Sequence, residues 1–374
     1  MRVRILWLVK PATTPTRRRY AQYPKMRVQA VNEIIGQYQI SKGIKKRELK
    51  RLASDKKVQS IQFASPLSPK EVEFLEKIVF SERPDITLRV YGHYSEKCDL
   101  SFIKRIPSLR KFSADSLMDA IGIENVIGLS NLEELGVGIY NLDNFDFLDK
   151  INPNLKELYL HRTKSKKPKI SSISRFADLE YLYLEGQQKG IEEIGKLKKL
   201  RKIVLRSIST KNLDFLKDLN ELWSVDIKLG RIQNFDALKT LSKLKYLELW
   251  QIRNLSDLSF ISDLKTLQNL FIQSLKQVTE LPNFENNTKL RRIYLENLKG
   301  LTYVNSLKNA PNLNELVYVL AENQEPENLI PALENNNLKS ISCKFGSDKK
   351  NNRFDQLAIE YKKVEFKYSE FNYE

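Results

Sequence analysis

The sequence predicts an α/β solenoid, in which many short units of one strand and one return segment stack side by side. Three observations predict it. The phrase apolar-x-x-apolar-x-apolar recurs, as in LKYLEL (244–249), LQNLFI (267–272) and LRRIYL (290–295). The spacing between copies is nearly constant, and a second apolar pattern fills the residues between them. An ordinary globular domain has no reason to keep one spacing for so long.

The repeated phrase starts at steps of twenty-one to twenty-five residues over most of the chain. Its clear copies begin at Leu109, Leu132, Leu155, Leu179, Leu200, Leu222, Leu244, Leu267, Leu290, Leu313 and Leu338. Looser copies begin at Val58, Asp85 and Tyr361. One unit cannot bury both of its open faces, so each copy needs neighbours that match it.

Each unit reads as a strand followed by a tight return. In LKELYL (155–160), the apolar Leu158 and Leu160 alternate with Glu157 and Tyr159, as a half-buried strand requires. In LSFISDLKTL (258–267), apolar residues fall three apart, which predicts a helical or 3-10 return.

The pattern LxxLxL with an apolar return limb resembles the leucine-rich repeat family, over about residues 85–374. Representative units are LYLEGQQKGIEEIGKLKKL and LWQIRNLSDLSFISDLKTL. The resemblance implies a curved horseshoe, with a parallel β-sheet on the concave face and short helical or 3-10 segments on the convex face. The family often has Asn three residues after the third Leu. That site here holds Thr163, Gln187, Ile208, Gly230, Ile252, Leu275 and Leu298. We therefore expect atypical repeats without a regular Asn ladder, whose turns are sealed mainly by apolar packing.

Stacks need capped ends, and the sequence predicts two regions: a basic N-terminal segment or cap at 1–57, and the repeat array with its C-terminal cap at 58–374. For the first cap we expect a strand at RVRILWLV (2–9), a loop at PATTPT (11–16) and then helices. The apolar residues Val28, Val31, Ile34, Ile35 and Tyr38 have helical spacing, and IKKRELKRL (44–52) resumes it.

At the other end, NNRFDQLAIEYKKVEFKYSEF (351–371) predicts a short helix and then a last strand. The helix would carry Phe354, Leu357, Ala358 and Tyr361, and the strand would carry Val364, Phe366 and Tyr368.

The composition is that of a folded protein, with 41% hydrophobic and 29% charged residues. No stretch of eighteen apolar residues occurs, so we expect no membrane span, and the apolar run ILWLV (5–9) is too short for a secretory signal. Cys98 and Cys343 are the only cysteines, and Cys343 falls on an apolar position of the repeat. We expect a reducing, cytoplasmic location.

Residues for catalysis are scarce. The two histidines, His93 and His161, lie far apart in the sequence, and no HExxH, GxSxG or nucleotide-binding loop occurs. The GVG at 136–138 lies inside a repeat strand. We therefore expect a binding protein without enzymatic activity, cofactor or metal.

Side chains at positions three, five and seven of the repeat would face outward and form columns along the concave face. These columns are rich in aromatic and charged residues, which either only cover the sheet or form a binding hot spot. We predict a protein partner, held by a monomeric scaffold. The candidate contacts are Tyr159, His161, Tyr183, Glu185, Arg206, Lys228, Tyr246, Glu248, Trp250, Phe271, Arg292 and Tyr294.

The net charge of +17 is uneven, and residues 1–57 hold sixteen Lys/Arg against three acidic residues. Such runs are usually solvated faces, but they also suit an anionic partner, namely nucleic acid, an acidic protein or lipid. The alternative anion-binding residues are Arg17, Arg18, Arg19, Lys45, Lys46, Arg47, Lys164, Lys166 and Lys167. No motif for reading bases occurs, so nucleic acid would be bound without sequence specificity.

Overall fold

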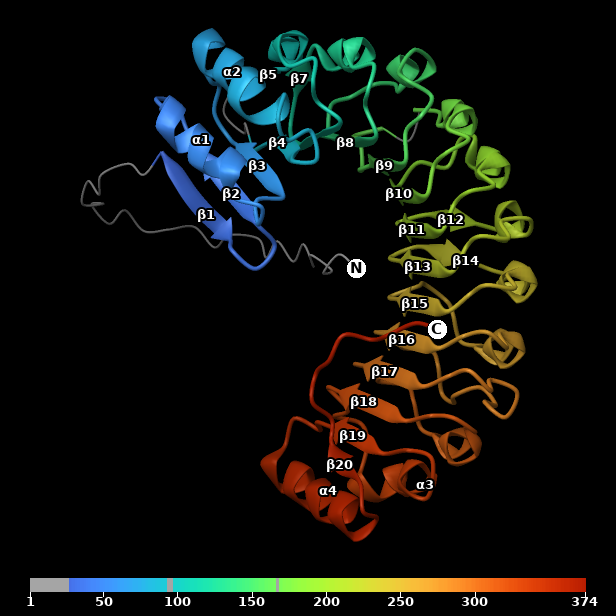
Figure 1. Cartoon of the computed structure of the whole chain (residues 1–374). Helices are drawn as coiled ribbons and strands as arrows, with labels where there is room; N and C mark the ends of the chain where they lie inside the picture. Colours follow the sequence, from blue (N-terminus) through green and yellow to red (C-terminus); the bar gives the residue numbers. More distant parts are fainter. Residues whose placement is uncertain (1–26, 93–96, 166–167) are drawn as a thin grey trace. The chain divides into compact units, whose positions relative to one another are not determined.

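The computed structural model describes residues 27–92, 97–165 and 168–374 (Figure 1). The chain divides into two compact units, Met1–Glu134 and Leu135–Glu374. The expected boundary after residue 57 falls between a helix and a strand of the first unit. The strand and loop expected at 2–9 and 11–16 lie outside the described residues.

The first unit opens with a hairpin and continues as a parallel sheet. Its strands are β1 (Val28–Asn32), β2 (Gln37–Ile40), β3 (Ser60–Phe63), β4 (Thr87–Tyr91), β5 (Cys98–Asp99), β6 (Lys111–Leu117) and β7 (Ala120–Ile121). β1 and β2 pair antiparallel, β2, β3, β4 and β6 are parallel neighbours, and β5 pairs with β7 in parallel. Its helices are α1 (Lys46–Ser54) and α2 (Pro69–Leu75), with a π-helical turn at Glu76–Phe80 and 3-10 turns at Ser101–Arg105 and Ile123–Gly128.

The N-terminal cap differs from the helical prediction for residues 28–38, which form the β1–β2 hairpin. Gly36 has φ +63°, and a Cβ there would lie 1.8 Å from the Lys57 carbonyl oxygen, so the chain turns where a helix would continue. Val31 and Ile34 are 50% and 89% exposed, so their helical spacing marks no buried face. The helix predicted at 44–52 is confirmed as α1.

The second unit is the repeat array. Its main strands are β8 (Glu134–Ile139), β9 (Glu157–Leu160), β10 (Tyr181–Glu185), β11 (Lys202–Arg206), β13 (Ser224–Lys228), β15 (Tyr246–Trp250), β16 (Asn269–Gln273), β17 (Arg292–Glu296), β18 (Glu315–Val319), β19 (Ser340–Cys343) and β20 (Val364–Glu365). From β9 onward each pairs in parallel with the next. Two short strands, β12 (Ser209–Thr210) and β14 (Arg231–Ile232), pair with each other.

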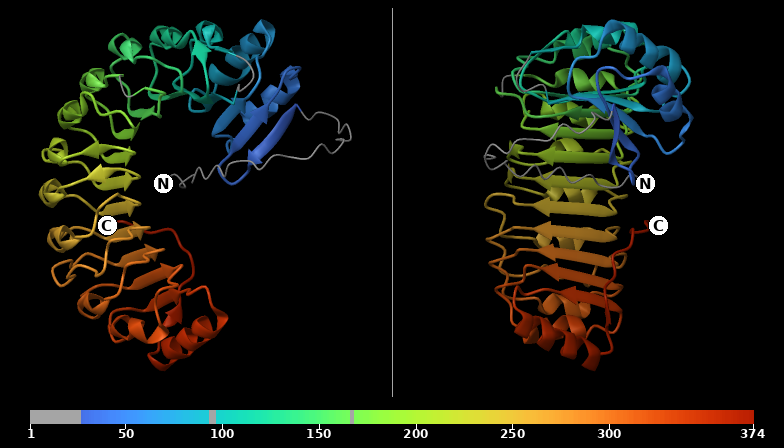
Figure 2. Two further views of the ribbon diagram at one scale, coloured as in Figure 1. Left: turned by 180° about the vertical axis from the view of Figure 1, so that it is seen from behind. Right: turned by 90° about the vertical axis from the view of Figure 1, so that its left-hand side faces the viewer.

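Short helical segments form the return limbs, on the side of the second unit opposite the strands (Figures 1 and 2). The 3-10 segments are Asp146–Asp149, Ser171–Arg175, Ile191–Lys196, Asp214–Leu216, Asp236–Thr240, Ser259–Asp263, Asn305–Asn309 and Pro326–Leu329. The α-helices are α3 (Ile330–Leu333) and α4 (Asp348–Glu360). The predicted 3-10 return is confirmed: the amide of Ile261 donates to the Leu258 carbonyl at 3.0 Å.

The leucines of the repeat stack in register to form the core of the second unit. Leu158 lies opposite Leu182, and Leu247 opposite Leu270, and all four are 0% exposed. Cys343 is likewise buried, 1% exposed, as its place in the repeat predicts. Each repeat therefore covers the open face of the one before it.

Buried side-chain amides also join neighbouring repeats. The sequence predicted turns closed mainly by apolar packing and did not indicate these hydrogen bonds. Asn287, 0% exposed, donates from Nδ2 to the carbonyls of Ile261 (2.8 Å) and Leu264 (3.0 Å) in the preceding repeat. Asn335 does the same for two carbonyls of its preceding repeat. These amides satisfy carbonyls on the return limbs, whereas the expected ladder site holds one amide, Gln187.

The predicted C-terminal helix is confirmed as α4, with Phe354 and Leu357 buried. The predicted last strand is shorter than expected, because β20 contains only Val364 and Glu365. Residues 366–374, hereafter called the tail, continue without regular secondary structure.

Candidate partner-binding surface

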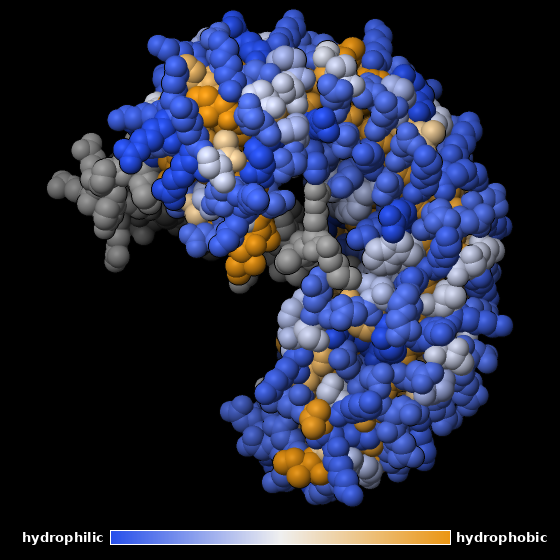
Figure 3. All heavy atoms as spheres, in the orientation of Figure 1, coloured by the Kyte–Doolittle hydropathy of each residue, from blue (hydrophilic) through white to orange (hydrophobic). Residues whose placement is uncertain are grey.

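The predicted columns exist on the strand face of the second unit, hereafter called the concave face. Tyr159 lies opposite Tyr183, and Phe271 opposite Tyr294, on neighbouring strands. Their ring centroids are 6.4 Å and 4.8 Å apart, and the second pair is stacked at 18°. All four rings are half-buried, so part of each aromatic surface faces solvent. Figure 3 shows pale and orange residues among hydrophilic ones along this side of the second unit.

Trp250 forms the centre of the surface. The Arg206 guanidinium lies 5.5 Å, and the Lys228 ammonium 5.9 Å, from the centroid of the ring. Lys228 also bonds the carboxylates of Glu248 (3.0 Å) and Asp226 (3.5 Å). Two cations are thus held beside one half-buried indole, an arrangement suited to cation–π contact.

On β15, two of the predicted contact residues are buried instead of presented. Glu248 is 4% exposed and Tyr246 is 6% exposed, and the Tyr246 hydroxyl donates to Glu248 Oε2 at 2.9 Å. Both side chains lie on the predicted face of the sheet, but neighbouring side chains cover them. Their carboxylate and hydroxyl therefore fix the surroundings of Lys228 and Trp250.

A charged cluster lies beside the Tyr159–Tyr183 pair. Glu185 accepts from Arg206 Nε at 3.2 Å and lies 3.7 Å from His161 Nδ1. Burial acts to raise the pKa of Glu185, but the neighbouring His161 side chain and the charge of Arg206 outweigh it, so the pKa lies below its ordinary value. Glu185 is therefore held as a carboxylate that pairs with Arg206 on the neighbouring strand.

The tail covers one edge of the concave face, which the sequence reasoning did not foresee. It runs from β20 past the N-terminal ends of β17, β16 and β15 toward β13 (Figure 2, red). Arg292, a predicted contact residue, is only 7% exposed, bonds Ser369 of the tail and pairs with Glu315. The alternating aromatic residues of the tail were the available signal, but they suit a last strand equally well.

The predicted anion-binding residues are only partly described. Arg17, Arg18, Arg19, Lys166 and Lys167 lie outside the described residues. Lys45, Lys46 and Arg47 are exposed at the start of α1 in the first unit, and Lys164 is exposed in the second unit. Lys46 lies over the Phe74 ring at 4.6 Å. The α1 cluster is a solvated helix end in this structure.

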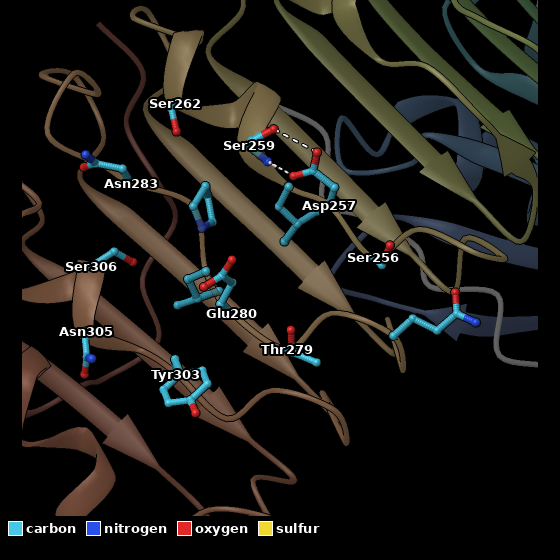
Figure 4. A pocket seen from close by; sticks show the side chains of 14 residues that line it. Ser256, Asp257, Ser259, Ser262, Thr279, Glu280, Asn283, Tyr303, Asn305 and Ser306 are labelled. Carbon is cyan, nitrogen blue, oxygen red and sulfur yellow. Dashed lines mark hydrogen bonds between the residues drawn. The ribbon is translucent and has the colours of Figure 1, made fainter.

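A polar hollow of about 880 Å³ lies among the loops that follow β15, β16 and β17 (Figure 4). Asp257 accepts from the amide and hydroxyl of Ser259 at 2.7 and 3.0 Å, so it caps the adjacent 3-10 turn. Tyr303, 60% exposed, forms part of the rim. The hollow is open and lined mainly by polar side chains, among them Ser256, Thr279 and Glu280.

Within the described ranges, no group of three or more His, Cys, Asp or Glu side chains could hold a metal ion. Burial raises the pKa of the Cys98 thiol to about 12, which makes it a poor nucleophile. Of the helices in the described part of the chain, none has the length and apolar character to cross a bilayer.

No protein-family model and no curated protein sequence matches the chain. Solved structures are similar in fold. An internalin (inlF) from Listeria monocytogenes aligns with a TM-score of 0.55 at 18% identity, covering 83% of this chain and 87% of that chain. A leucine-rich repeat protein from Leptospira interrogans aligns with a TM-score of 0.43 at 16% identity, and the alignment covers 86% of this chain and 98% of that chain.

The chain is therefore a leucine-rich-repeat protein by fold, a solenoid of parallel strands and 3-10 returns, as the sequence predicts. At these identities the likeness concerns the fold alone.

Proposed function

We propose that the chain is a non-catalytic recognition protein whose second unit holds a protein partner against its concave face. One observation carries the proposal: the half-buried rings of Phe271 and Tyr294 lie in register on β16 and β17, and the half-buried Trp250 on the neighbouring strand β15 has two cations beside its ring. Large aromatic residues and arginine dominate the energetics of protein interfaces.

The surface also has mixed charge around its aromatic centre. Arg206 pairs with the half-buried Glu185 and Lys228 pairs with the buried Glu248, so a partner would meet cations beside Trp250 and a carboxylate at Glu185. Such an arrangement favours one orientation of a protein partner and disfavours a purely anionic surface. The rigid parallel sheet holds these side chains in place before binding, which lowers the ordering cost.

The test compares the intact chain with Trp250→Ala/Tyr294→Ala as baits in quantitative affinity capture read by mass spectrometry. A protein retained by the intact chain is then titrated against both by calorimetry. We expect the double variant to bind at least about 30-fold more weakly, the effect of losing about 2 kcal/mol of hot-spot energy.

The matched control is Tyr303→Ala/Ile359→Ala, which removes two apolar side chains that are 60% and 74% exposed outside the concave face. It should bind like the intact chain, and both variants should keep the melting temperature. Equal partner affinity for all three proteins would remove the concave face from consideration.

A further inference from the structure

The concave face holds the tail by its backbone. Arg292 Nη1 donates to the Ser369 carbonyl at 3.1 Å, and Arg291 Nη2 donates to the Asn372 carbonyl at 2.7 Å. Backbone carbonyls are common to every peptide, so these contacts recognise an extended chain without regard to its side chains.

Gln268 makes a two-way bond to one residue of the tail. Its Nε2 donates to the Glu374 carbonyl at 3.2 Å, and its Oε1 accepts from the Glu374 amide at 3.0 Å. Arg291 Nη2 also donates to this Oε1 at 3.1 Å, which orients the amide group. Gln268 is 5% exposed, so its amide group is packed in the orientation that bonds the backbone of Glu374.

The residues that hold the tail, Gln268, Arg291 and Arg292, belong to one strip along the edge of the sheet. This strip also selects an aromatic residue at position 371. The guanidinium of Arg291 lies 5.0 Å, and that of Arg292 5.1 Å, from the centroid of the Phe371 ring. Arginines that bond carbonyls and also lie against an aromatic ring read the backbone and the side chain together.

Two aromatic side chains of the repeat array contact Tyr373. Its ring lies 5.0 Å from Trp223 and 6.4 Å from Tyr246, and its hydroxyl accepts from Asn269 Nδ2 at 3.2 Å. The Lys202 ammonium lies 4.6 Å from the centroid of the Trp223 ring. Trp223 is thus a platform with a cation and a bound aromatic ring beside it.

Charge completes the recognition. Arg291 Nη1 lies 2.9 Å from Glu374 Oε1. Between these contacts the side chains of Tyr368, Glu370 and Asn372 are exposed, and Tyr368 is 89% exposed. The strip therefore reads the order aromatic, any residue, aromatic, acidic, as in Phe371-Asn372-Tyr373-Glu374.

We infer that this strip is a peptide-binding groove, and that the tail occupies it in place of a partner segment. The groove consists of Trp223, Tyr246, Gln268, Asn269, Arg291 and Arg292. Its external ligand is an extended segment of a partner protein with the pattern aromatic-x-aromatic-acidic. The inference rests on the proposed function, because it names the kind of partner that the concave face takes.

The tail also regulates the groove. A tethered segment acts at an effective concentration on the order of millimolar, so a partner segment must compete with it. A substitution that weakens the contact between tail and groove raises the apparent affinity for a partner segment. A substitution that damages the groove itself abolishes binding of the partner segment.

The experiment measures fluorescence anisotropy of a labelled peptide, FKYSEFNYE, added to the full chain. We expect at least tenfold tighter binding to Phe371→Ala/Tyr373→Ala than to the native chain. Adding Trp223→Ala and Arg291→Ala to that variant should abolish binding. A peptide with alanine in place of both matching aromatic residues, FKYSEANAE, should not bind either protein. Equal affinity for the native and tail-variant chains, or binding of FKYSEANAE, would overturn the groove.

A charge exchange between groove and peptide distinguishes loss of recognition from loss of folding, because an unfolded variant cannot gain a new preference. In the tail-variant background, Arg291→Glu should prefer the peptide FKYSEFNYK over FKYSEFNYE by about tenfold, the reverse of Arg291. An unchanged preference counts against the groove. Tyr303→Ala/Ile359→Ala in the same background should keep peptide binding. Because the peptide test changes neither Trp250 nor Tyr294, its failure leaves the test of the aromatic columns independent.

Discussion

The rings of Trp223 and Tyr373 lie 5.0 Å apart, although one precedes the strand β13 and the other lies beyond the last helix of the chain. This contact joins the middle of the repeat array to its C-terminal end. It exists because the strands stack in parallel, so that their N-terminal ends form one edge along which an extended segment can run. The concave face therefore has an aromatic centre around Trp250 and a covered edge under the tail.

The leucine core should respond strongly to truncation. Leu247 is 0% exposed and stacks between Val225 and Leu270 on neighbouring strands. We expect Leu247→Ala to lower the free energy of unfolding by about 2–5 kcal/mol, because a cavity opens in the shared core. Urea titration measures it, with the 74% exposed Ile359→Ala as the control near zero. A loss below about 1 kcal/mol for Leu247→Ala would contradict a continuous core.

The hydrogen bonds from Asn287 to the preceding repeat, hereafter called the amide clamp, can be tested with two adjacent asparagines. Asn287 is buried and donates to two carbonyls of the preceding repeat, whereas Asn286 is exposed. Asn287→Ala should cost about 1–3 kcal/mol, since both carbonyls lose their donor inside the stack. Asn286→Ala should change the free energy of unfolding by less than about 0.5 kcal/mol. Similar effects for the two variants would show that the clamp does not stabilise the array.

Glu185 should make stability depend on pH. Its pKa is lower in the folded state than its ordinary value, because the neighbouring His161 side chain and the charge of Arg206 outweigh burial. A lowered pKa stabilises the fold fully above the ordinary value of 4.5, and this contribution is lost as the pH falls through the folded pKa.

We therefore expect Glu185→Gln to destabilise the chain at pH 7, and the difference from the native chain to shrink below pH 4.5. Urea unfolding at pH 7 and at pH 3.5 measures both differences. Glu180→Gln on the exposed surface serves as control. A difference that is the same at both pH values would assign the effect of Glu185 to packing.

Binding to nucleic acid separates the two functional hypotheses. The mixed charge around Trp250 and the solvated cluster at Lys45, Lys46 and Arg47 predict no strong attraction for a polyanion. In a gel-shift titration at 50 mM and 200 mM salt, we expect micromolar or weaker affinity for duplex DNA. Nanomolar affinity at 50 mM that falls steeply at 200 mM and disappears in a charge reversal of these three residues would favour the anion-binding alternative.

The repeat phrase predicted much of the fold because a leucine every few residues has one physical use, which is burial between neighbouring strands. The same reasoning failed for residues 28–38, where apolar residues at helical spacing form a hairpin around Gly36. There the conformation of one glycine outweighed the periodicity of its neighbours.

The candidate site was predicted in direction but not in exposure. The sequence placed Tyr246, Glu248 and Trp250 on one side of β15, and the contacts among Tyr246, Glu248, Lys228 and Trp250 lie on that side. Whether such a side chain meets solvent depends on adjacent strands and on the tail, so Glu248 is buried and Trp250 is half-exposed.

The sequence by itself determined the parallel stack, its 3-10 returns and the side of the sheet that carries the aromatic columns, because these follow from periodic patterns within each repeat. Only the tertiary structure decided that the tail lies against Trp223, Gln268 and Arg291, because that contact joins residues far apart in the chain and has no periodic signal. Local spacing specifies which face a side chain takes, whereas long-range packing specifies what that face touches.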